Sequence, residues 1–445
     1  MIRDAARWGA PLLGTLTIVA GLSSTPAAAQ PPATTVALVG GRVVDGTGGP
    51  VLERATILVV SGRVQEVGAE SAVKVPQGAA RIDVRGKTII PGLINAHGHV
   101  DAARDSTVPI RDQLVSQLRM YAQYGVTTVF SLGSGPTDAQ EGLKLRDEQE
   151  GSALDRARMY SAGLVVADRT AEDARKSVNR NVDQRVNVIK IRVDGEDTNP
   201  NKMTPDVYRA VIEEAHGRGV PVAAHLYYLK DARGLLDAGV DVLAHSVRDQ
   251  DVPPAFIADL KRRNVVCIPT LTRELSVFAY ETTPAFFGDP FFLRGKALYG
   301  AQMVQLSDPV SQEKIRTSKE AQSIKQAMQQ ASRNLRLLSD AGVAIAMGTD
   351  TGANLVGRWQ GFFEHTELEL MVKAGMTPVQ TLTAATGTAA RIMGLDQHIG
   401  TLRPGRWADF VVLNANPLAD IRNTRQIDSV WIAGRRLPGG SPPSP

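Results

Sequence analysis

Short apolar runs alternate with longer amphipathic stretches through the middle of the chain. Eight runs of strand-like character end at residues 94–95, 127–132, 157–161, 188–193, 221–225, 241–245, 265–269 and 343–350. Residues 205–218 form the clearest helical stretch, because Thr204 can cap it, Pro205 suits its first turn and Gly219 follows its end. Residues 231–238 and 313–338 are further predicted helices. Strands that alternate with helices predict an α/β fold with a (β/α)8 TIM barrel over residues 92–395, with functional side chains at the C-terminal ends of the strands.

The two ends of the chain have a different pattern. Residues 36–68 and 399–434 contain short apolar strands separated by glycine-containing turns. This pattern predicts one small β-sandwich domain built from residues 36–91 and 396–437. The tail 438–445 is rich in proline, glycine and serine, and we expect it to be disordered.

One stretch interrupts the alternation. Residues 272–309 carry many aromatic residues and prolines between the seventh predicted strand and its helix. We expect a long loop on the face where the strands end. It can form a lid or substrate wall, or it can be a locally packed insertion with no contact to substrate.

The first 29 residues are typical of an export signal. Arg3 and Arg7 precede an apolar stretch at residues 10–22, and small residues at 26–30 offer a cleavage site after Ala29. The apolar stretch is short for a membrane span, although an uncleaved anchor is the alternative. The pattern predicts an exported protein, periplasmic or secreted, that has no membrane association after signal cleavage.

Composition narrows the function classes. Of the 445 residues, 43% are hydrophobic and 22% charged, and the formal net charge is +4. The basic residues are scattered, so we expect a small-molecule substrate and no nucleic-acid partner; a homo-oligomer is left open. The single cysteine, Cys267, excludes an intramolecular disulfide and lies in an apolar run, which predicts a buried structural thiol.

Polar residues gather at the ends of the predicted strands. In chain order they are His97, His99, Lys190, His225, His245 and Asp350. The chain has only seven histidines, and four of them fall at these strand ends. Such a concentration on one rim of a barrel predicts a metal site.

The chemistry of these side chains suits hydrolysis. Two imidazoles at i and i+2 of a strand point to the same face, and imidazole and carboxylate are good zinc donors. A lysine beside them is reasonable if CO2 carboxylates it, since a carbamate can bridge two divalent ions. Two ions can polarise a carbonyl and activate water, and Asp350 can accept the proton of that water and pass it to the leaving nitrogen. Each residue also has a plain alternative: Asp350 can cap a helix, Lys190 can pair with Asp194, and a lone strand-end histidine can simply be hydrogen-bonded.

Together these elements resemble the amidohydrolase superfamily. The matching parts are AHGHVD at 96–101, the later strand-end residues in the family's order, and the closing segment GTLRPGRWADFVVLNANP at 400–417. The resemblance implies that His97, His99 and Asp350 bind one divalent ion and that His225 and His245 bind the other. N6-carboxylated Lys190 would bridge them. Zinc is the first candidate, and cobalt or manganese also suits these ligands.

Within the superfamily, the chain resembles the imidazolonepropionase-like and prolidase-like branch, which includes metal-dependent dipeptidases and N-acyl amino acid hydrolases. The segments AHSVRD at 244–249 and EHTELELMVKAGMTPVQTLT at 364–383 carry this likeness. Deaminases of the superfamily tend to have a glutamate three residues after the strand-five histidine, where this chain has Tyr228. This departure counts against deamination.

Three further residues are candidate substrate contacts. Tyr227 can donate a hydrogen bond to a developing oxyanion, or it can pack at the barrel mouth. Arg248 can clamp a substrate carboxylate, or it can pair with Asp249 or Asp251. His365 can line the pocket, or it can serve a capping or surface role.

These observations predict a binuclear metal-dependent hydrolase that cleaves an amide or peptide bond. The expected substrate is a small molecule with a free carboxylate, such as a dipeptide or an N-acyl amino acid. A cyclic-amide or lactone hydrolase, or a deaminase, is the alternative within enzymes. An exported binding protein that has lost its chemistry is the alternative outside them, and the complete ligand set argues against it.

Overall fold

Strands from both ends of the chain pair in one sheet. The computed structural model describes residues 35–103, 107–150, 153–193, 195, 199–352 and 356–438, which belong to one compact unit. The predicted signal peptide and residues 439–445 of the predicted disordered tail lie outside the described residues.

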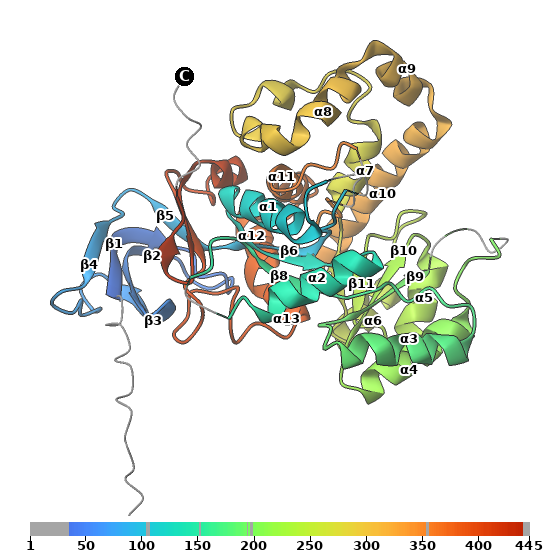
Figure 1. Cartoon of the computed structure of the whole chain (residues 1–445), viewed down its shortest axis with the longest axis horizontal. Coiled ribbons are helices and arrows are strands. Elements are labelled where there is room, and N and C mark those ends of the chain that lie inside the picture. Colours follow the sequence, from blue (N-terminus) through green and yellow to red (C-terminus); the bar gives the residue numbers. More distant parts are fainter. Residues whose placement is uncertain are drawn as a thin grey trace, which may run out of the picture. The chain divides into compact units, whose positions relative to one another are not determined.

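This sheet contains β1 (Thr35–Val43), β2 (Leu52–Val60), β3 (Arg63–Ala69), β4 (Ala80–Asp83), β5 (Thr88–Pro91), β13 (Phe410–Leu413), β14 (Ile427–Ile432) and β15 (Arg435–Arg436). Its order is β15-β14-β13-β5-β1-β2-β3, with β4 paired to β1. The two chain ends meet where β13 runs antiparallel to β5, so that Phe410 lies opposite Pro91 (Figure 1). The strands that we predicted as a sandwich are thus hydrogen-bonded into one continuous sheet.

The middle of the chain supplies two parallel sheets. One contains β6 (Leu93–Gly98), β7 (Val126–Ser131) and β8 (Arg158–Ser161). The other contains β9 (Ile189–Val193), β10 (Val222–Leu226), β11 (Val242–Ala244) and β12 (Val266–Ile268). These strands coincide with seven of the eight predicted runs and are largely buried, as expected for parallel strands covered on both faces.

Backbone hydrogen bonds connect the edges of these two sheets. Asn187 N donates to Ser161 O at 3.1 Å and Val166 N donates to Lys190 O at 2.8 Å, which joins β8 to β9. At the other side, the predicted eighth strand forms only an isolated parallel bridge, between Ile345 and Cys267. Ala96 N then donates to Met347 O at 2.9 Å, so this segment lies between β12 and β6.

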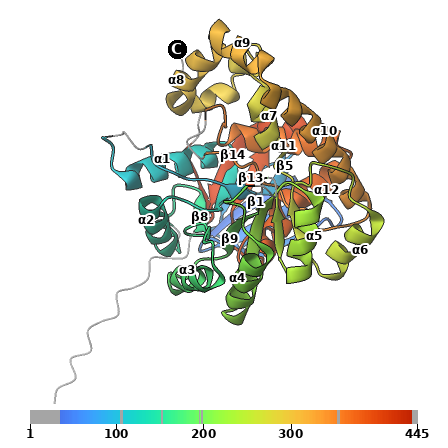
Figure 2. The ribbon, with the colours of Figure 1, turned by 90° about the vertical axis from the view of Figure 1, so that its right-hand side faces the viewer.

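Helices surround the parallel strands (Figure 2). They are α1 (Ile110–Gln123), α2 (Pro136–Asp147), α3 (Ala171–Asp183), α4 (Pro205–Gly217), α5 (Leu229–Ala238), α6 (Pro254–Arg262), α9 (Pro309–Thr317), α10 (Lys319–Asp340), α11 (Phe362–Lys373), α12 (Pro378–Thr383) and α13 (Ala389–Ile392). The predicted helices at 205–218 and 231–238 are confirmed as α4 and α5. The one predicted at 313–338 is broken, because Ser318 leaves the helical backbone and its side chain accepts a hydrogen bond from Ala321 N to cap α10.

The aromatic-rich stretch 272–309 is helical, which corrects the prediction of a long loop. It contains α7 (Leu271–Phe278), the short 3₁₀ turns 285–288 and 292–295, and α8 (Lys296–Ser307). Its rings are the reason: Phe291, Phe292 and Tyr299 are buried in a cluster that also includes Trp359 and Phe362. An apolar cluster of this size holds the segment as packed structure.

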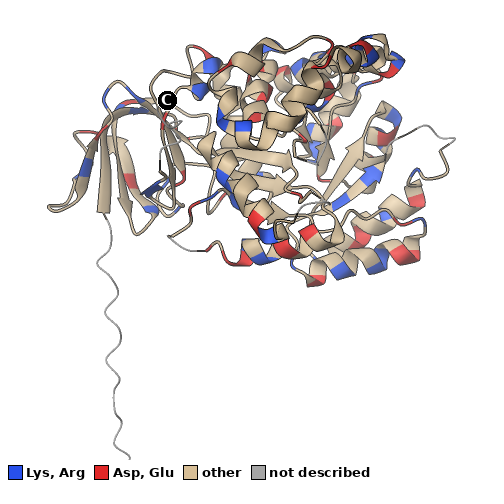
Figure 3. Cartoon of the chain, turned by 45° about the horizontal axis from the view of Figure 1, so that its top comes forward, with Lys and Arg blue, Asp and Glu red and all other residues tan. Residues whose placement is uncertain are grey.

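Other sequence expectations can be checked here as well. Cys267 is a buried free thiol, and burial raises its pKa to about 12, so the predicted structural role fits. Acidic and basic residues are interspersed along the helices in Figure 3. Within the described ranges, no helix combines the length and apolarity that crossing a bilayer requires.

A buried ion pair ties the sheet of the chain ends to the parallel strands. Arg158 of β8 donates to Asp409, which directly precedes β13, with Nε and Oδ2 at 2.7 Å. Both side chains are almost completely buried, and Asp409 also accepts a hydrogen bond from Ala433 N at 2.7 Å. Removing one partner of such a pair strongly destabilises the protein, since the remaining charge is left buried without a counter-charge.

We therefore expect Arg158→Met to destabilise the protein by about 3–5 kcal/mol, because it leaves the Asp409 carboxylate buried without its cation. Thermal unfolding followed by circular dichroism measures the effect. Arg119→Met is the matched control, since Arg119 pairs with Asp155 where both side chains are more than half exposed. That variant should change stability by less than about 1 kcal/mol; equal destabilisation by both would contradict the assignment.

Candidate active site

The carboxyl ends of the parallel strands bring His97, His99 and Asp350 into contact. His97 lies in β6, His99 directly follows it, and Asp350 follows the eighth segment. His99 Nε2 lies 2.9 Å from Asp350 Oδ1, and His97 Nε2 lies 3.3 Å from the same oxygen. One ligand atom from each residue lies within 4.8 Å of the other two, which is compatible with a shared metal ion.

The other three predicted residues adjoin this trio. Lys190 Nζ of β9 lies 3.4 Å from His97 Nε2. The rings of His97 and His245 have centroids 4.6 Å apart, and those of His245 and His225 are 4.2 Å apart. The structure therefore brings all six sequence-predicted residues into one contiguous cluster.

The imidazoles of His97 and His245 are electrically neutral at neutral pH. Burial, together with neighbouring positive groups, lowers the pKa of His97 and of His245 well below the usual value. His245 Nδ1 lies 2.6 Å from Thr270 Oγ1, while its buried Nε2 has no hydrogen-bond partner among the described residues. A neutral imidazole anchored through one nitrogen presents the lone pair of the other, the arrangement that metal-binding histidines use.

In the His99–Asp350 pair the two pKa values shift apart. Burial alone would lower the pKa of His99, but the hydrogen bond and charge of Asp350 outweigh it and raise that pKa. Burial would likewise raise the pKa of Asp350, but His97, His99 and Arg358 hold it well below its usual range. Asp350 is therefore a carboxylate at neutral pH.

The backbone around the cluster is strained. Asp350, His245 and Thr270 have φ angles of 57°, 147° and 49°, in a region that side-chain-bearing residues rarely adopt. Each residue held in such a backbone conformation lowers the stability of the fold by about 1–3 kcal/mol, and such residues concentrate at functional sites. Close by, a Cβ on Gly352 would lie 2.1 Å from His99 O, so only glycine fits that position.

A network of buried polar side chains holds the residues next to the cluster. Asn95 Oδ1 accepts from His97 N at 3.0 Å, and Asn95 Nδ2 donates to Glu364 Oε1 at 2.6 Å. The same Glu364 oxygen accepts from the hydroxyls of Thr349 and Thr351, both at 3.0 Å. Burial raises the pKa of Glu364 to about 7. Glu364 of α11 thus fixes the residues that flank both His97 and Asp350.

Comparison with known proteins agrees with this arrangement. The sequence model of the Amidohydrolase family matches residues 88–437, which contain every residue of the cluster. The chain belongs to the amidohydrolase family. The parallel sheets, which carry the cluster at the carboxyl ends of their strands, confirm the α/β class of the predicted fold.

Similar proteins lie in the branch that we predicted. An ochratoxinase from Aspergillus niger is 27% identical over 293 residues, which is 63% of this chain and about half, 52%, of the length of that protein. An imidazolonepropionase from Deinococcus radiodurans is 23% identical over 406 residues, 87% of this chain and 93% of the other. The crystal structure of a provisionally assigned prolidase from Bifidobacterium longum is 29% identical, covers 92% of this chain and 95% of its own, and gives a TM-score of 0.72. The chain therefore lies in the imidazolonepropionase-like and prolidase-like branch of the amidohydrolase superfamily.

Two predicted substrate contacts follow histidines of the cluster in the chain: Tyr227 comes two residues after His225 and Arg248 three after His245. The surroundings of Arg248 differ from the prediction. Tyr227 is half-buried, and burial raises the pKa of its phenol. The Arg248 guanidinium, 4.8 Å from the Tyr227 ring, is buried and paired with Glu274, and it donates to Leu226 O at 2.7 Å. Arg248 is thus engaged inside the protein, with neither Asp249 nor Asp251 as its partner, and direct binding of a substrate carboxylate by Arg248 is not supported.

The prediction that His365 lines the substrate pocket is wrong. His365 lies in α11, is buried, and has its ring nitrogens 2.9 Å from Thr424 Oγ1 and 2.7 Å from Tyr124 O. Tyr124 ends α1, just before β7 begins, so this contact is at the opposite end of the strands from the cluster. Burial lowers the pKa of His365 to about 3, and the ring is a neutral structural group.

Sequence reasoning missed two arginines that reach Asp350. Arg358 Nη1 donates to Asp350 Oδ2 at 2.8 Å and to Asp350 O at 2.9 Å. Arg273 Nε lies 3.3 Å from Asp350 Oδ2, and its Nη1 donates to Glu274 at 2.7 Å. The available signal was their position, since Arg273 follows the seventh strand and Arg358 follows the eighth.

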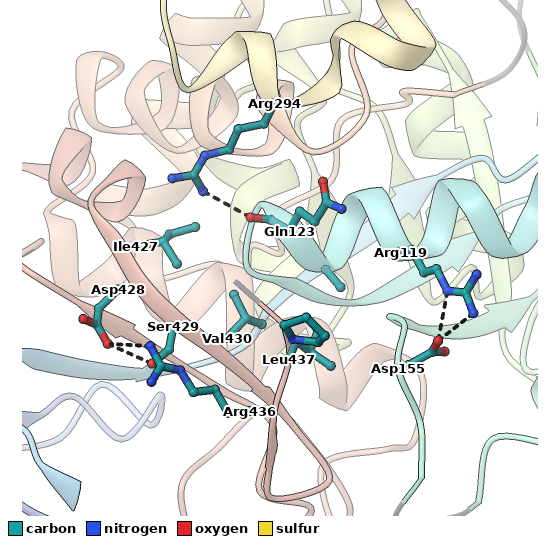
Figure 4. A pocket seen from close by; sticks show the side chains of 12 residues that line it. Arg119, Gln123, Asp155, Arg294, Ile427, Asp428, Ser429, Val430, Arg436 and Leu437 are labelled. Atoms are coloured by element: carbon teal, nitrogen blue, oxygen red, sulfur yellow. Dashed lines mark hydrogen bonds and ion pairs between the residues drawn. The ribbon is translucent and has the colours of Figure 1, made fainter. Parts of the chain in front are cut away.

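A cavity of about 250 Å³ lies away from this cluster. It is bordered by α1 and β14 and lined by residues that include Arg119, Gln123, Arg294 and Asp428 (Figure 4). Its arginines already have partners: Arg119 pairs with Asp155, and Arg294 donates to Gln123 O at 3.3 Å. None of the predicted site residues lines it.

The elevated pKa of Glu364 gives a pH-dependent prediction. A carboxyl whose pKa rises from 4.5 to about 7 on folding binds more protons in the folded state, so its contribution to stability falls as the pH rises through that window. Glu364→Gln keeps an acceptor oxygen and removes the titration. We expect the stability of this variant relative to wild type to increase by about 1–3 kcal/mol between pH 5 and pH 8.

Urea unfolding at both pH values measures this difference. Glu66→Gln, in the half-exposed strand β3 and away from the cluster, serves as the control and should show no such change. A pH-independent difference for Glu364→Gln would contradict the buried, protonated carboxyl.

Proposed function

We propose that the protein is a binuclear metal-dependent amidohydrolase that cleaves the amide or peptide bond of a small carboxylate-bearing substrate, a dipeptide or an N-acyl amino acid. The observation that carries this proposal is the contiguous cluster of four histidines, Lys190 and Asp350 at the carboxyl ends of the strands. We also propose that the hydrogen-bonded parallel strands and the segment 343–347 close into a (β/α)8 barrel, and that residues 1–29 direct export.

The donor set fits two divalent ions. His245 Nε2 is a buried nitrogen without a hydrogen-bond partner in the described structure, His97 Nε2 faces Asp350 and Lys190, and both imidazoles are neutral. His97, His99 and Asp350 would hold one ion, His225 and His245 the other, and carboxylated Lys190 would bridge them. When bound, such ions supply Lewis-acid activation of water and of the scissile carbonyl.

The protein's own residues would supply the proton transfers. Asp350 accepts the proton of the attacking water as the new C–O bond forms, and it passes that proton to the nitrogen as the C–N bond breaks. The Tyr227 phenol remains protonated at neutral pH, since its pKa is raised, and it can donate to the oxyanion. The products are a carboxylic acid and an amine.

The charge at the mouth of the cluster favours an anionic substrate. Arg273 and Arg358 both approach Asp350 Oδ2, so two guanidinium groups face one carboxylate. Glu274 pairs with both Arg248 and Arg273, so three guanidinium groups share two carboxylates here. The surplus positive charge supports recognition of a substrate carboxylate by Arg273 and Arg358, in place of the predicted Arg248 clamp.

The relatives support an amide or related bond as the target. The provisionally assigned prolidase is named for peptide hydrolysis, and the ochratoxinase is named for ochratoxin. In this chain, Tyr228 occupies the place where deaminases of the superfamily tend to have a glutamate, which favours hydrolysis over deamination.

A hydrolysis screen tests the proposal. Metal-loaded protein should release free amino acid from dipeptides or N-acyl amino acids, and metal analysis should find close to two ions per chain. Asp350→Asn should lower kcat by about 10²–10⁴, because it removes the proton acceptor. Cleavage of lactones or ring amides alone, or turnover in metal-free protein, would overturn the assignment.

The two arginines give a sharper test. Arg358→Gln should raise KM for a carboxylate substrate about tenfold to a hundredfold, because a charge-assisted hydrogen bond is lost. The same substrate with its carboxylate capped as an amide is the control, and its KM should be similar for the wild type and the variant. An equal rise for both substrates would show that Arg358 acts on the site and not on the carboxylate.

A further inference from the structure

A cavity of about 390 Å³ lies directly beside the catalytic cluster. It is formed by the first turns of α1, by α8 and by the segment 357–360. Polar side chains, among them Asp101, Asp112 and Arg358, line it together with the apolar side chains of Val108, Leu298 and Trp359. The volume lies within the range of small-molecule sites, about 300–1,000 Å³.

Two hydrogen-bonded residues connect this cavity to the cluster. Arg358 lines it and donates to Asp350 Oδ2. Gln360 also lines it, and its Nε2 donates to His99 O at 2.9 Å and to Gln117 Oε1 at 2.8 Å. A molecule held by Arg358 would therefore have the cavity on one side and the catalytic residues on the other.

Two of the apolar side chains that line the cavity are exposed to solvent. Val108 is 49% exposed and Leu298 is 44% exposed, and both are among the few large apolar side chains that the described structure leaves open to solvent. They come from segments nearly two hundred residues apart and line the same cavity. Exposed apolar surface gathered at a cavity marks a binding site more often than isolated exposed residues do.

Aromatic packing holds the walls in place. The Tyr299 and Trp359 rings have centroids 5.0 Å apart, and the Tyr299 hydroxyl donates to Gln360 O. Gly357 N donates to Gln302 Oε1 at 3.0 Å, which joins α8 to the segment that carries Arg358. The helical insertion therefore builds one wall of the cavity and also positions Arg358 in another.

We propose that this cavity binds the apolar side chain of the substrate residue whose carboxylate Arg358 holds, so that the enzyme prefers amides with a bulky apolar C-terminal residue. This inference rests on the proposed function and adds its substrate class. An apolar group in the cavity would cover Val108 and Leu298, and burial of a phenylalanine-sized group favours binding by about tenfold to a hundredfold.

Leu298→Asp in the metal-loaded enzyme tests the proposal. The substrates are N-acetyl-L-phenylalanine and N-acetylglycine, or the corresponding dipeptides. The ratio of kcat/KM for the phenylalanine substrate to that for the glycine substrate should fall about tenfold or more. Val304→Asp is the matched control, because Val304 lies on the same helix, is 75% exposed and does not line the cavity. It should leave the ratio unchanged.

A binding measurement separates this inference from the proposed function. N-methanesulfonyl-L-phenylalanine and N-methanesulfonylglycine carry the same carboxylate but no scissile amide, and calorimetry gives their Kd values. Leu298→Asp should raise Kd about tenfold for the phenylalanine probe only. An equal effect on both probes, no effect, or the same effect from Val304→Asp would overturn the cavity assignment, whereas absence of amide hydrolysis in the wild type would overturn the proposed function.

Discussion

The carboxylate of Asp350 is the contact on which the site depends. It lies within 3.3 Å of two imidazoles, from β6 and the residue that follows it, and of two guanidinium groups, from α7 and the segment 357–360. Its backbone is strained, with φ at 57°, and its amide nitrogen donates to His97 O at 2.6 Å. A strained residue with this many partners is held by its surroundings, so the site is pre-organised before any substrate arrives.

One face of α11 provides much of that support. Glu364 and Glu367 are three residues apart and therefore lie on the same side of the helix. Glu364 accepts hydrogen bonds from Asn95, Thr349 and Thr351, which flank His97 and Asp350. Glu367 accepts hydrogen bonds from the backbone of Leu271 and Thr272, at 2.8 and 2.7 Å, and so fixes the start of α7, which carries Arg273. A single helix face thus aligns the strand ends with the insertion.

The sequence allowed the strand ends and the gathering of the six polar residues to be predicted because both follow local rules. Periodicity located seven of the parallel strands, and parallel strands place their carboxyl ends on one rim. The partner of Arg248 could not be predicted, because Glu274 reaches it only after α7 has folded back over the strand ends. The contacts of Arg273 and Arg358 with Asp350 could not be predicted either, because they join distant segments. The helical form of residues 272–309 likewise depends on aromatic contacts between distant segments.

The residues of the cluster and the residues that form the cavity lie in different parts of the fold. In the cluster, His97, Lys190 and His225 lie in β6, β9 and β10, and His99 and His245 directly follow β6 and β11, so strand hydrogen bonds hold their backbones. The cavity beside Arg358 is instead formed by α8 and the segment 357–360, which are joined mainly by Tyr299, Trp359 and Gln302. Changes in those contacts would reshape the cavity without moving a strand. Substrate choice can therefore vary in the insertion while the reaction stays fixed by the strand ends.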